Sequence, residues 1–191
     1  MKPPARGGPP REVRLIGGTL KRSKLPVADR PGLRPTPDRV RETLFNWLGT
    51  DLTGWRVLDA FAGSGALGFE AASRGAAEVL LLERDPVLVA SLRASQVRLN
   101  ATTLRIELAD ALAWMARCAP ARFDLVLIDP PFDAGLQPAA LAAAAPLLAD
   151  GGCLYLESPA SLAAAEMPAG FALLRHGRAG LVHYHLLRRS T

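Results

Sequence analysis

The chain has 191 residues, a length that suits one domain with a full hydrophobic core. Its two cysteines, Cys118 and Cys153, are far apart and lack the spacing of metal ligands, so we expect small buried residues in a reducing compartment. No stretch has the length and apolarity of a membrane span, and the basic N-terminus lacks the apolar centre of a signal peptide. We therefore expect a cytoplasmic monomer that does not contact membranes.

The net charge of +5 is distributed unevenly along the chain. Residues 1–42 contain eleven Lys or Arg and four Asp or Glu, which gives this segment +7 and leaves −2 for the remainder. A segment with this charge attracts phosphate backbones. We expect a disordered tail at residues 1–11 and a single domain at residues 12–191, with a basic hairpin and loop at residues 12–35.

The first predicted helix follows the basic loop. Thr36, Pro37 and Asp38 supply an N-cap, a first-turn proline and an acid at the positive helix end. The apolar residues of the next turns form one stripe, and Gly49 is placed to stop the helix after Leu48.

After Trp55 the sequence alternates between short β-rich runs and longer helical runs. Strands are expected at residues 56–60, 78–83, 104–108, 123–128, 153–157, 171–175 and 181–187. Helices are expected at residues 66–74, 86–100, 111–117 and 138–149. This alternation predicts a Rossmann-like, doubly wound α/β sheet of seven strands, mostly parallel, and the terminal hairpin adds one antiparallel strand.

A polar tetrapeptide, Asp129-Pro130-Pro131-Phe132, directly follows the apolar run at residues 123–128. The carboxyl end of a buried parallel strand is where open α/β sheets bind their ligands. A carboxylate and a carbonyl there can accept hydrogen bonds from an exocyclic amine, while the aromatic ring stacks on a nucleobase. The structural alternative is a strand that ends in a tight proline turn, with Phe132 as a packing residue.

A glycine-rich loop at residues 59–68 follows the first strand of the alternating region. Gly63, Gly65 and Gly68 match the dinucleotide pattern G-x-G-x-x-G, and Glu83 ends the next strand. The carboxylate of Asp59 would repel a pyrophosphate, whereas S-adenosylmethionine carries an ammonium and a sulfonium. The loop therefore favours the methyl donor over a dinucleotide.

Asp110 follows the third strand and leaves two interpretations open. Its side chain could accept a hydrogen bond from the adenine amino group of the donor, or it could simply cap the next helix.

These motifs, together with residues 34–48, resemble the bacterial 16S ribosomal RNA guanine-N2 methyltransferase family. The resemblance implies the class I methyltransferase fold, S-adenosylmethionine as donor, and a guanine of 16S ribosomal RNA as acceptor, within the small ribosomal subunit or its precursor. It implies that Asp129 and the Pro130 carbonyl hold the amine and that Phe132 stacks on the base. The donor site would include Asp59, Phe61, Gly63, Ser64, Gly65, Glu83, Arg84, Asp110 and Ala111. The RNA site would include Arg14, Lys21, Arg22, Lys24, Arg34, Thr36 and Arg39. The last three would lie near the methionine end of the donor or near the RNA.

Two other functions remain open from the sequence. An adenine-N6 methyltransferase acting on DNA or RNA would use the same tetrapeptide. An RNA-binding ribosome assembly factor could keep this fold without catalysis. We expect no metal site, because His183 and His185 share one strand face without a third ligand and are predicted to face solvent.

Overall fold

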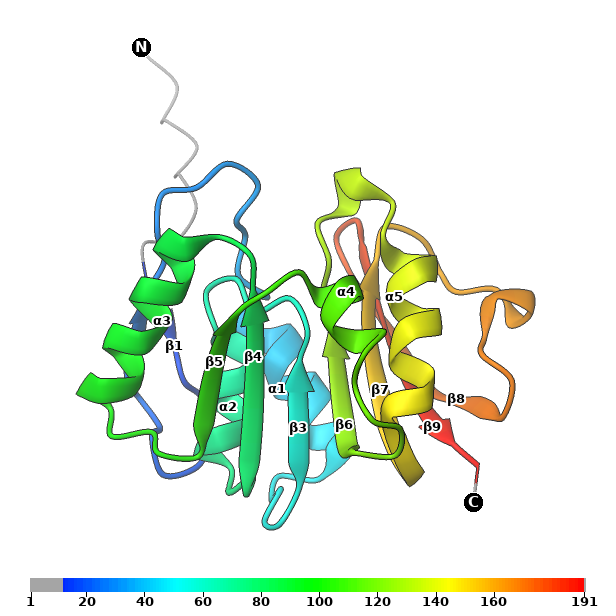
Figure 1. Cartoon of the computed structure of the whole chain (residues 1–191), viewed down its shortest axis with the longest axis horizontal. Coiled ribbons are helices and arrows are strands. Elements are labelled where there is room, and N and C mark those ends of the chain that lie inside the picture. The colour runs from blue at the N-terminus through cyan, green and yellow to red at the C-terminus, as the bar shows by residue number, and fades with distance from the viewer. Residues whose placement is uncertain (1–11, 191) are drawn as a thin grey trace.

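The structure, a computed structural model, describes residues 12–190, apart from the side chain of Asp133. The tail predicted at residues 1–11 lies outside the described residues. Seven strands form one sheet in the order β5-β4-β3-β6-β7-β9-β8 (Figure 1). Their bounds are β3 Arg56–Asp59, β4 Glu78–Glu83, β5 Leu104–Leu108, β6 Phe123–Ile128, β7 Leu148–Ser158, β8 Phe171–Ala179 and β9 Val182–Arg189.

Helices cover both faces of this sheet. They are α1 Asp38–Leu48, α2 Ala66–Ser73, α3 Pro86–Arg98, α4 Ala111–Met115 and α5 Gln137–Ala144. Buried apolar residues of α1, α2 and α3 pack in one core cluster, and those of α4 and α5 pack in a second cluster. Figure 1 shows α4 and α5 in front of the sheet, with α1 and α2 behind it. The predicted doubly wound arrangement is confirmed.

Strand direction defines the edge on which the site lies. The pairs β3–β4, β4–β5, β3–β6 and β6–β7 are parallel, whereas β9 is antiparallel to both β7 and β8. The prediction of a mostly parallel seven-stranded sheet with one reversed strand is therefore confirmed. Because β3, β4, β6 and β7 run in the same direction, their carboxyl ends meet at one edge, which we call the carboxyl edge.

The predicted N-terminal hairpin is present as β1 Glu12–Arg14 and β2 Lys24–Pro26, which pair antiparallel. Its attachment depends on Glu70 of α2. The Glu70 carboxylate accepts hydrogen bonds from Ile16 N and Gly17 N, both at 2.8 Å. It also forms ion pairs with Arg74 Nε at 2.9 Å and Arg41 Nη1 at 3.4 Å. Glu70 and Arg41 are fully buried, so a buried ionic network fixes the hairpin to the sheet.

The start of α1 differs from the sequence prediction. Pro37 occupies the N-cap position without a side-chain hydrogen bond, and the Thr36 hydroxyl contacts two carboxylates of the carboxyl edge instead. The helix predicted at residues 138–149 is also shorter than expected. It ends at Ala144 and passes through a 3-10 turn at Ala145–Leu147 into β7, because the proline within that turn cannot donate a backbone hydrogen bond.

The prediction that His183 and His185 both face solvent is wrong for His185, which is fully buried. Its Nε2 accepts a hydrogen bond from Leu162 N at 3.0 Å, and its Nδ1 lies 3.3 Å from the Leu156 carbonyl oxygen. The cause is that the segment connecting β7 to β8 covers the face of the sheet at His185, where Leu162 contacts its ring. Within residues 12–190, no helix combines the length and apolarity needed to cross a bilayer.

Candidate active site

Two acids hold the glycine-rich loop at the carboxyl edge. Asp59, at the end of β3, accepts a hydrogen bond on Oδ2 from Gly68 N at 2.9 Å. Glu83, at the end of β4, accepts one on Oε2 from Gly63 N, also at 2.9 Å. Gly65 begins α2 with φ +80°, and a Cβ there would lie 2.5 Å from the Leu92 side chain. Glycine is therefore required at this turn, both for its backbone conformation and for lack of space.

The tetrapeptide lies beside this loop because β6 pairs with β3, and Ala60 N donates to the Leu127 carbonyl at 3.0 Å. Asp129 is half-buried, and Phe132, which begins a short 3-10 turn, is half-exposed. The Phe132 ring is thus partly accessible for stacking rather than fully packed inside the fold.

A third acid joins Asp59 and Asp129 on this edge. Glu157, near the end of β7, is only 4% exposed, and it accepts hydrogen bonds on Oε1 from Thr36 Oγ1 at 2.9 Å and from the Tyr155 hydroxyl at 2.8 Å. Thr36 Oγ1 also lies 3.3 Å from Asp129 Oδ2. Thr36, predicted to lie near the methionine end of the donor or near the RNA, is buried between these two carboxylates.

Burial and mutual repulsion disturb the ionisation of these acids. Burial, followed by the charges of Glu157 and Asp59, raises the pKa of Asp129 well above its ordinary value. Burial also raises the pKa of Glu157, although the hydrogen bonds from Tyr155 and Thr36 oppose the shift. Burial is likewise the main cause that raises the pKa of Asp59 to about 7. None of the ion pairs formed by residues 12–190 includes one of these three acids.

The raised pKa of Asp59 predicts that the ligand-free protein loses stability as the pH rises. The folded protein keeps this proton up to about pH 7, while the unfolded chain releases it near 3.8. The folded state therefore binds more protons between these pH values, and the free energy of unfolding should fall by up to about 4 kcal/mol from this group. Urea denaturation at pH 5 and pH 8 measures the part of this change that falls between those pH values, about 3 kcal/mol.

The matched variant for this prediction is Asp59→Asn, which can still accept from Gly68 N but cannot ionise. Its loss of stability between pH 5 and pH 8 should be clearly smaller than that of the wild type. Identical losses in the two proteins would contradict the assignment of the shift to Asp59.

The remaining residues predicted to bind the donor lie on or near the same edge, with different local roles. Asp110 caps α4, and its Oδ1 accepts a hydrogen bond from Ala113 N at 2.9 Å, so the capping interpretation describes its contact in this structure. Ala111 is buried beneath it, Arg84 is exposed, and Phe61 and Ser64 are half-buried in and beside the glycine loop.

Most of the residues predicted to bind RNA are on the surface. The exposed members of that set are Arg14, Lys21, Arg22, Lys24, Arg34 and Arg39. Lys24 Nζ forms an ion pair with Glu12 at 2.8 Å, across the hairpin. Thr36 is the member that the structure places elsewhere.

Glu157 and Tyr155 were not identified from the sequence, because neither belongs to a recognisable motif. The only available signal was that Glu157 ends an apolar run that was itself predicted to be a parallel strand. The same criterion that selected Asp129 would have selected it.

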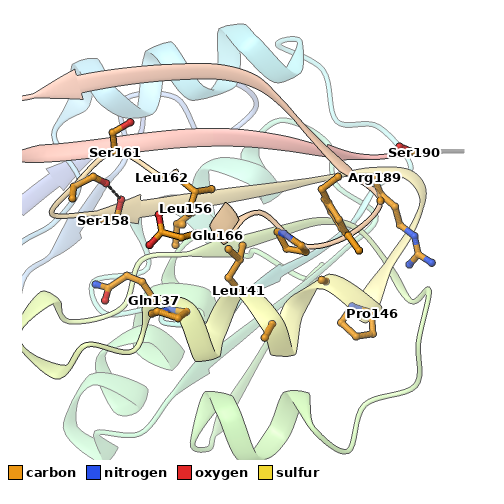
Figure 2. Close-up of a pocket in the computed structure, with 18 of the residues that line it drawn as sticks. Gln137, Leu141, Pro146, Leu156, Ser158, Ser161, Leu162, Glu166, Arg189 and Ser190 are labelled. Carbon is orange, nitrogen blue, oxygen red and sulfur yellow. Dashed lines mark hydrogen bonds between the residues drawn. The ribbon is translucent and has the colours of Figure 1, made fainter. Parts of the chain in front are cut away.

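A cavity of about 810 Å³ opens on the other face of β7 from Glu157. Its wall is formed by α5, the alternate β7 residues Leu156 and Ser158, and the segment that connects β7 to β8 (Figure 2). None of the residues predicted to bind the donor or the amine lines it. The cavity is therefore separate from the carboxyl edge.

The carboxyl edge suits a cationic ligand such as S-adenosylmethionine. A bound sulfonium or ammonium would favour the ionised forms of these three acids, which have no ion pair among residues 12–190, whereas a pyrophosphate would oppose their ionisation. Glu83 uses its two oxygens to bind Gly63 N and Asp85 N, and each oxygen retains a lone pair that can accept from a ribose hydroxyl.

Comparisons with known proteins agree with this chemistry. The family described as "Conserved hypothetical protein 95" matches residues 13–188. The chain is 41% identical to "Ribosomal RNA small subunit methyltransferase D" of Escherichia coli K12, over all of this chain and 96% of that protein. It is 37% identical to the protein of the same name from Haemophilus influenzae, over 92% of this chain and 93% of that one.

Solved structures give the same result. The E. coli protein named "Putative methyltransferase yhhF" superposes with a TM-score of 0.84 at 38% identity, over 94% of this chain and 98% of that one. The chain therefore belongs to the family of ribosomal RNA small subunit methyltransferase D, whose members are S-adenosylmethionine-dependent methyltransferases with the class I fold.

Proposed function

We propose that this protein methylates the exocyclic N2 amine of a guanine in 16S ribosomal RNA, acting as a cytoplasmic monomer on the small ribosomal subunit or its precursor. The observation that carries the proposal is the position of Asp129 and Phe132 beside the glycine loop, at the edge shared with Asp59 and Glu83. The names of the relatives support ribosomal RNA as the substrate. The resemblance of residues 34–48 to guanine-N2 enzymes favours guanine over adenine.

The proposed reaction is an in-line attack of the guanine amine on the methyl group that bound S-adenosylmethionine supplies. The amine lone pair is delocalised into the guanine ring. The Asp129 carboxylate and the Pro130 carbonyl would draw the amine hydrogens out of the ring plane, which would localise the lone pair on the nitrogen. Alignment of two bound reactants can supply about 7 to 11 kcal/mol, so most of the catalysis is positional. Stacking on Phe132 would return about 1 to 3 kcal/mol of the cost of extruding the base.

The proposed function is tested by nucleoside analysis. Small subunits from cells that lack this gene are incubated with labelled donor and the protein, and N2-methylguanosine is the expected product. Label in N6-methyladenosine would identify the adenine-specific alternative. A protein that fails to bind S-adenosylmethionine would favour the assembly factor.

The basic hairpin and loop should bind RNA phosphates. Replacing Lys21 and Arg34 by Ala is expected to weaken binding of the small subunit and to lower the slope of log affinity against log salt by about 1.4, since each contact with a single strand contributes roughly 0.7. Filter binding between low and physiological salt measures the slope. Arg117→Ala, an exposed arginine after α4, is the control. An unchanged slope in the double variant would place the RNA elsewhere.

A further inference from the structure

Glu157 is a buried acid to which the proposed reaction gives no role. It has no cationic partner among residues 12–190, although a buried carboxylate normally requires one. Instead it accepts hydrogen bonds from two hydroxyl groups, those of Thr36 and Tyr155. It is joined to Asp129 through the Thr36 oxygen, at distances of 2.9 and 3.3 Å.

The Thr36 hydroxyl has one proton and lies between two carboxylates. It can donate to only one of them, and it can accept a hydrogen bond from the other only if that acid is protonated. The bond to Glu157 is the shorter one. The arrangement is therefore complete when one additional proton is present, with Asp129 donating to Thr36 and Thr36 donating to Glu157. If the Thr36 proton moves to Glu157 and the Asp129 proton moves to Thr36, the net result is the transfer of one proton from Asp129 to Glu157.

We propose that Asp129, Thr36 and Glu157 form a relay that takes up the proton released by the methylated amine, and that Glu157 stores it. The inference rests on the proposed function. The raised pKa values of Asp129 and Glu157 support it, because both acids hold a proton more readily than an exposed carboxylate. Two contacts hold the three side chains in position. The Tyr155 hydroxyl donates to Glu157, and the Thr36 carbonyl accepts a hydrogen bond from Arg41 Nε at 3.2 Å.

The proton and charge balance of the reaction supports uptake at this place. The amine lone pair forms the new nitrogen–carbon bond, and the electrons of the carbon–sulfur bond remain on sulfur. The positive charge thus moves from sulfur to the amine nitrogen, which then gives its proton to Asp129. Thr36 takes that proton and passes its own to Glu157, so Asp129 is again a carboxylate. Before the reaction the two carboxylates face the positive sulfonium. After it the sulfur is neutral and Glu157 carries a proton, so the summed charge of the acids and the reactants is unchanged.

The first test measures protons without catalysis. Calorimetry at pH 7, in buffers of different ionisation enthalpy, gives the protons released when the wild type binds S-adenosylmethionine and when it binds its neutral product, S-adenosylhomocysteine. We expect the wild type to release more protons when it binds S-adenosylmethionine than when it binds S-adenosylhomocysteine. In Glu157→Gln the difference between the two ligands should be at most half as large. Glu42→Gln, the same change on the exposed side of α1, should behave as wild type. Equal proton release with the two ligands in the wild type would overturn the relay.

The second test measures single-turnover methyl transfer to small subunits across pH. At saturating donor, Glu157→Gln and Thr36→Val should lower the rate by about 100-fold, because they interrupt the relay. Thr36→Ser, which keeps the hydroxyl, should stay within about threefold of wild type. A wild-type rate and pH profile in Glu157→Gln would overturn the proposal. Wild-type protein that shows the ligand-dependent proton release but methylates no ribosomal RNA would contradict the proposed function and leave proton storage by the cluster standing.

Discussion

Asp129→Ala should lower the single-turnover rate of methyl transfer by about 1000-fold while changing the donor dissociation constant by less than about threefold. The reason is that Asp129 is expected to hold the amine and to bond it more strongly as positive charge develops in the transition state, and removing one such group typically costs about 3 to 4 kcal/mol. The donor is instead expected to bind to the glycine loop and Glu83, which form hydrogen bonds with each other and none with Asp129. Rapid-quench kinetics and calorimetry provide the two measurements.

A matched control for this prediction is Asp150→Ala. Asp150 is an exposed acid that pairs with Arg189 near the start of β7, at the opposite end from Glu157. Its removal should leave both rate and affinity unchanged. If Asp129→Ala lost donor affinity in proportion to rate, Asp129 would belong to the donor site and not to the amine site.

Glu70→Gln should lower the free energy of unfolding by about 3 to 5 kcal/mol. The substitution leaves the nearly buried Arg74 without its anion and leaves the fully buried Arg41 with only the exposed Asp38 as a partner. A buried charge that loses its partner is far more costly than a lost surface contact. The NH2 group of the glutamine would also replace one of the two oxygens that accept from Ile16 N and Gly17 N, so one of these donors would lose its acceptor. Urea denaturation monitored by circular dichroism measures the loss.

Glu78→Gln provides the comparison, because Glu78 also pairs with two arginines but is partly exposed. The expected loss there is below about 1 kcal/mol, as for other surface ion pairs. Similar losses in Glu70→Gln and Glu78→Gln would show that the buried network does not hold the hairpin.

The sheet could be predicted because each strand is a short apolar run between turn residues, and this pattern depends only on local sequence. The bounds of β4, β5 and β6 agree with those predicted. The glycine loop and Asp129 were found in the same way, since strand ends in a parallel sheet meet at one edge.

Features that depend on strand order or on distant contacts could not be predicted. Thr36 resembled an N-cap in its local sequence, but its hydroxyl bonds to Glu157, 121 residues further along the chain. Period-two alternation placed His183 and His185 on one face but could not show that the segment connecting β7 to β8 covers His185. The contact of Arg41 with Glu70 joins two helices whose packing no local pattern specifies.

Arg41 has one more consequence for how the protein can be dissected. Its guanidinium donates to the Arg14 carbonyl at 2.9 Å and to the Thr36 carbonyl at 3.2 Å, so one side chain anchors both the hairpin and the hydroxyl between the acids. The hairpin is therefore not a detachable module. Deleting it would alter turnover and substrate affinity together. Single changes at its exposed cations would alter substrate affinity and leave turnover unchanged.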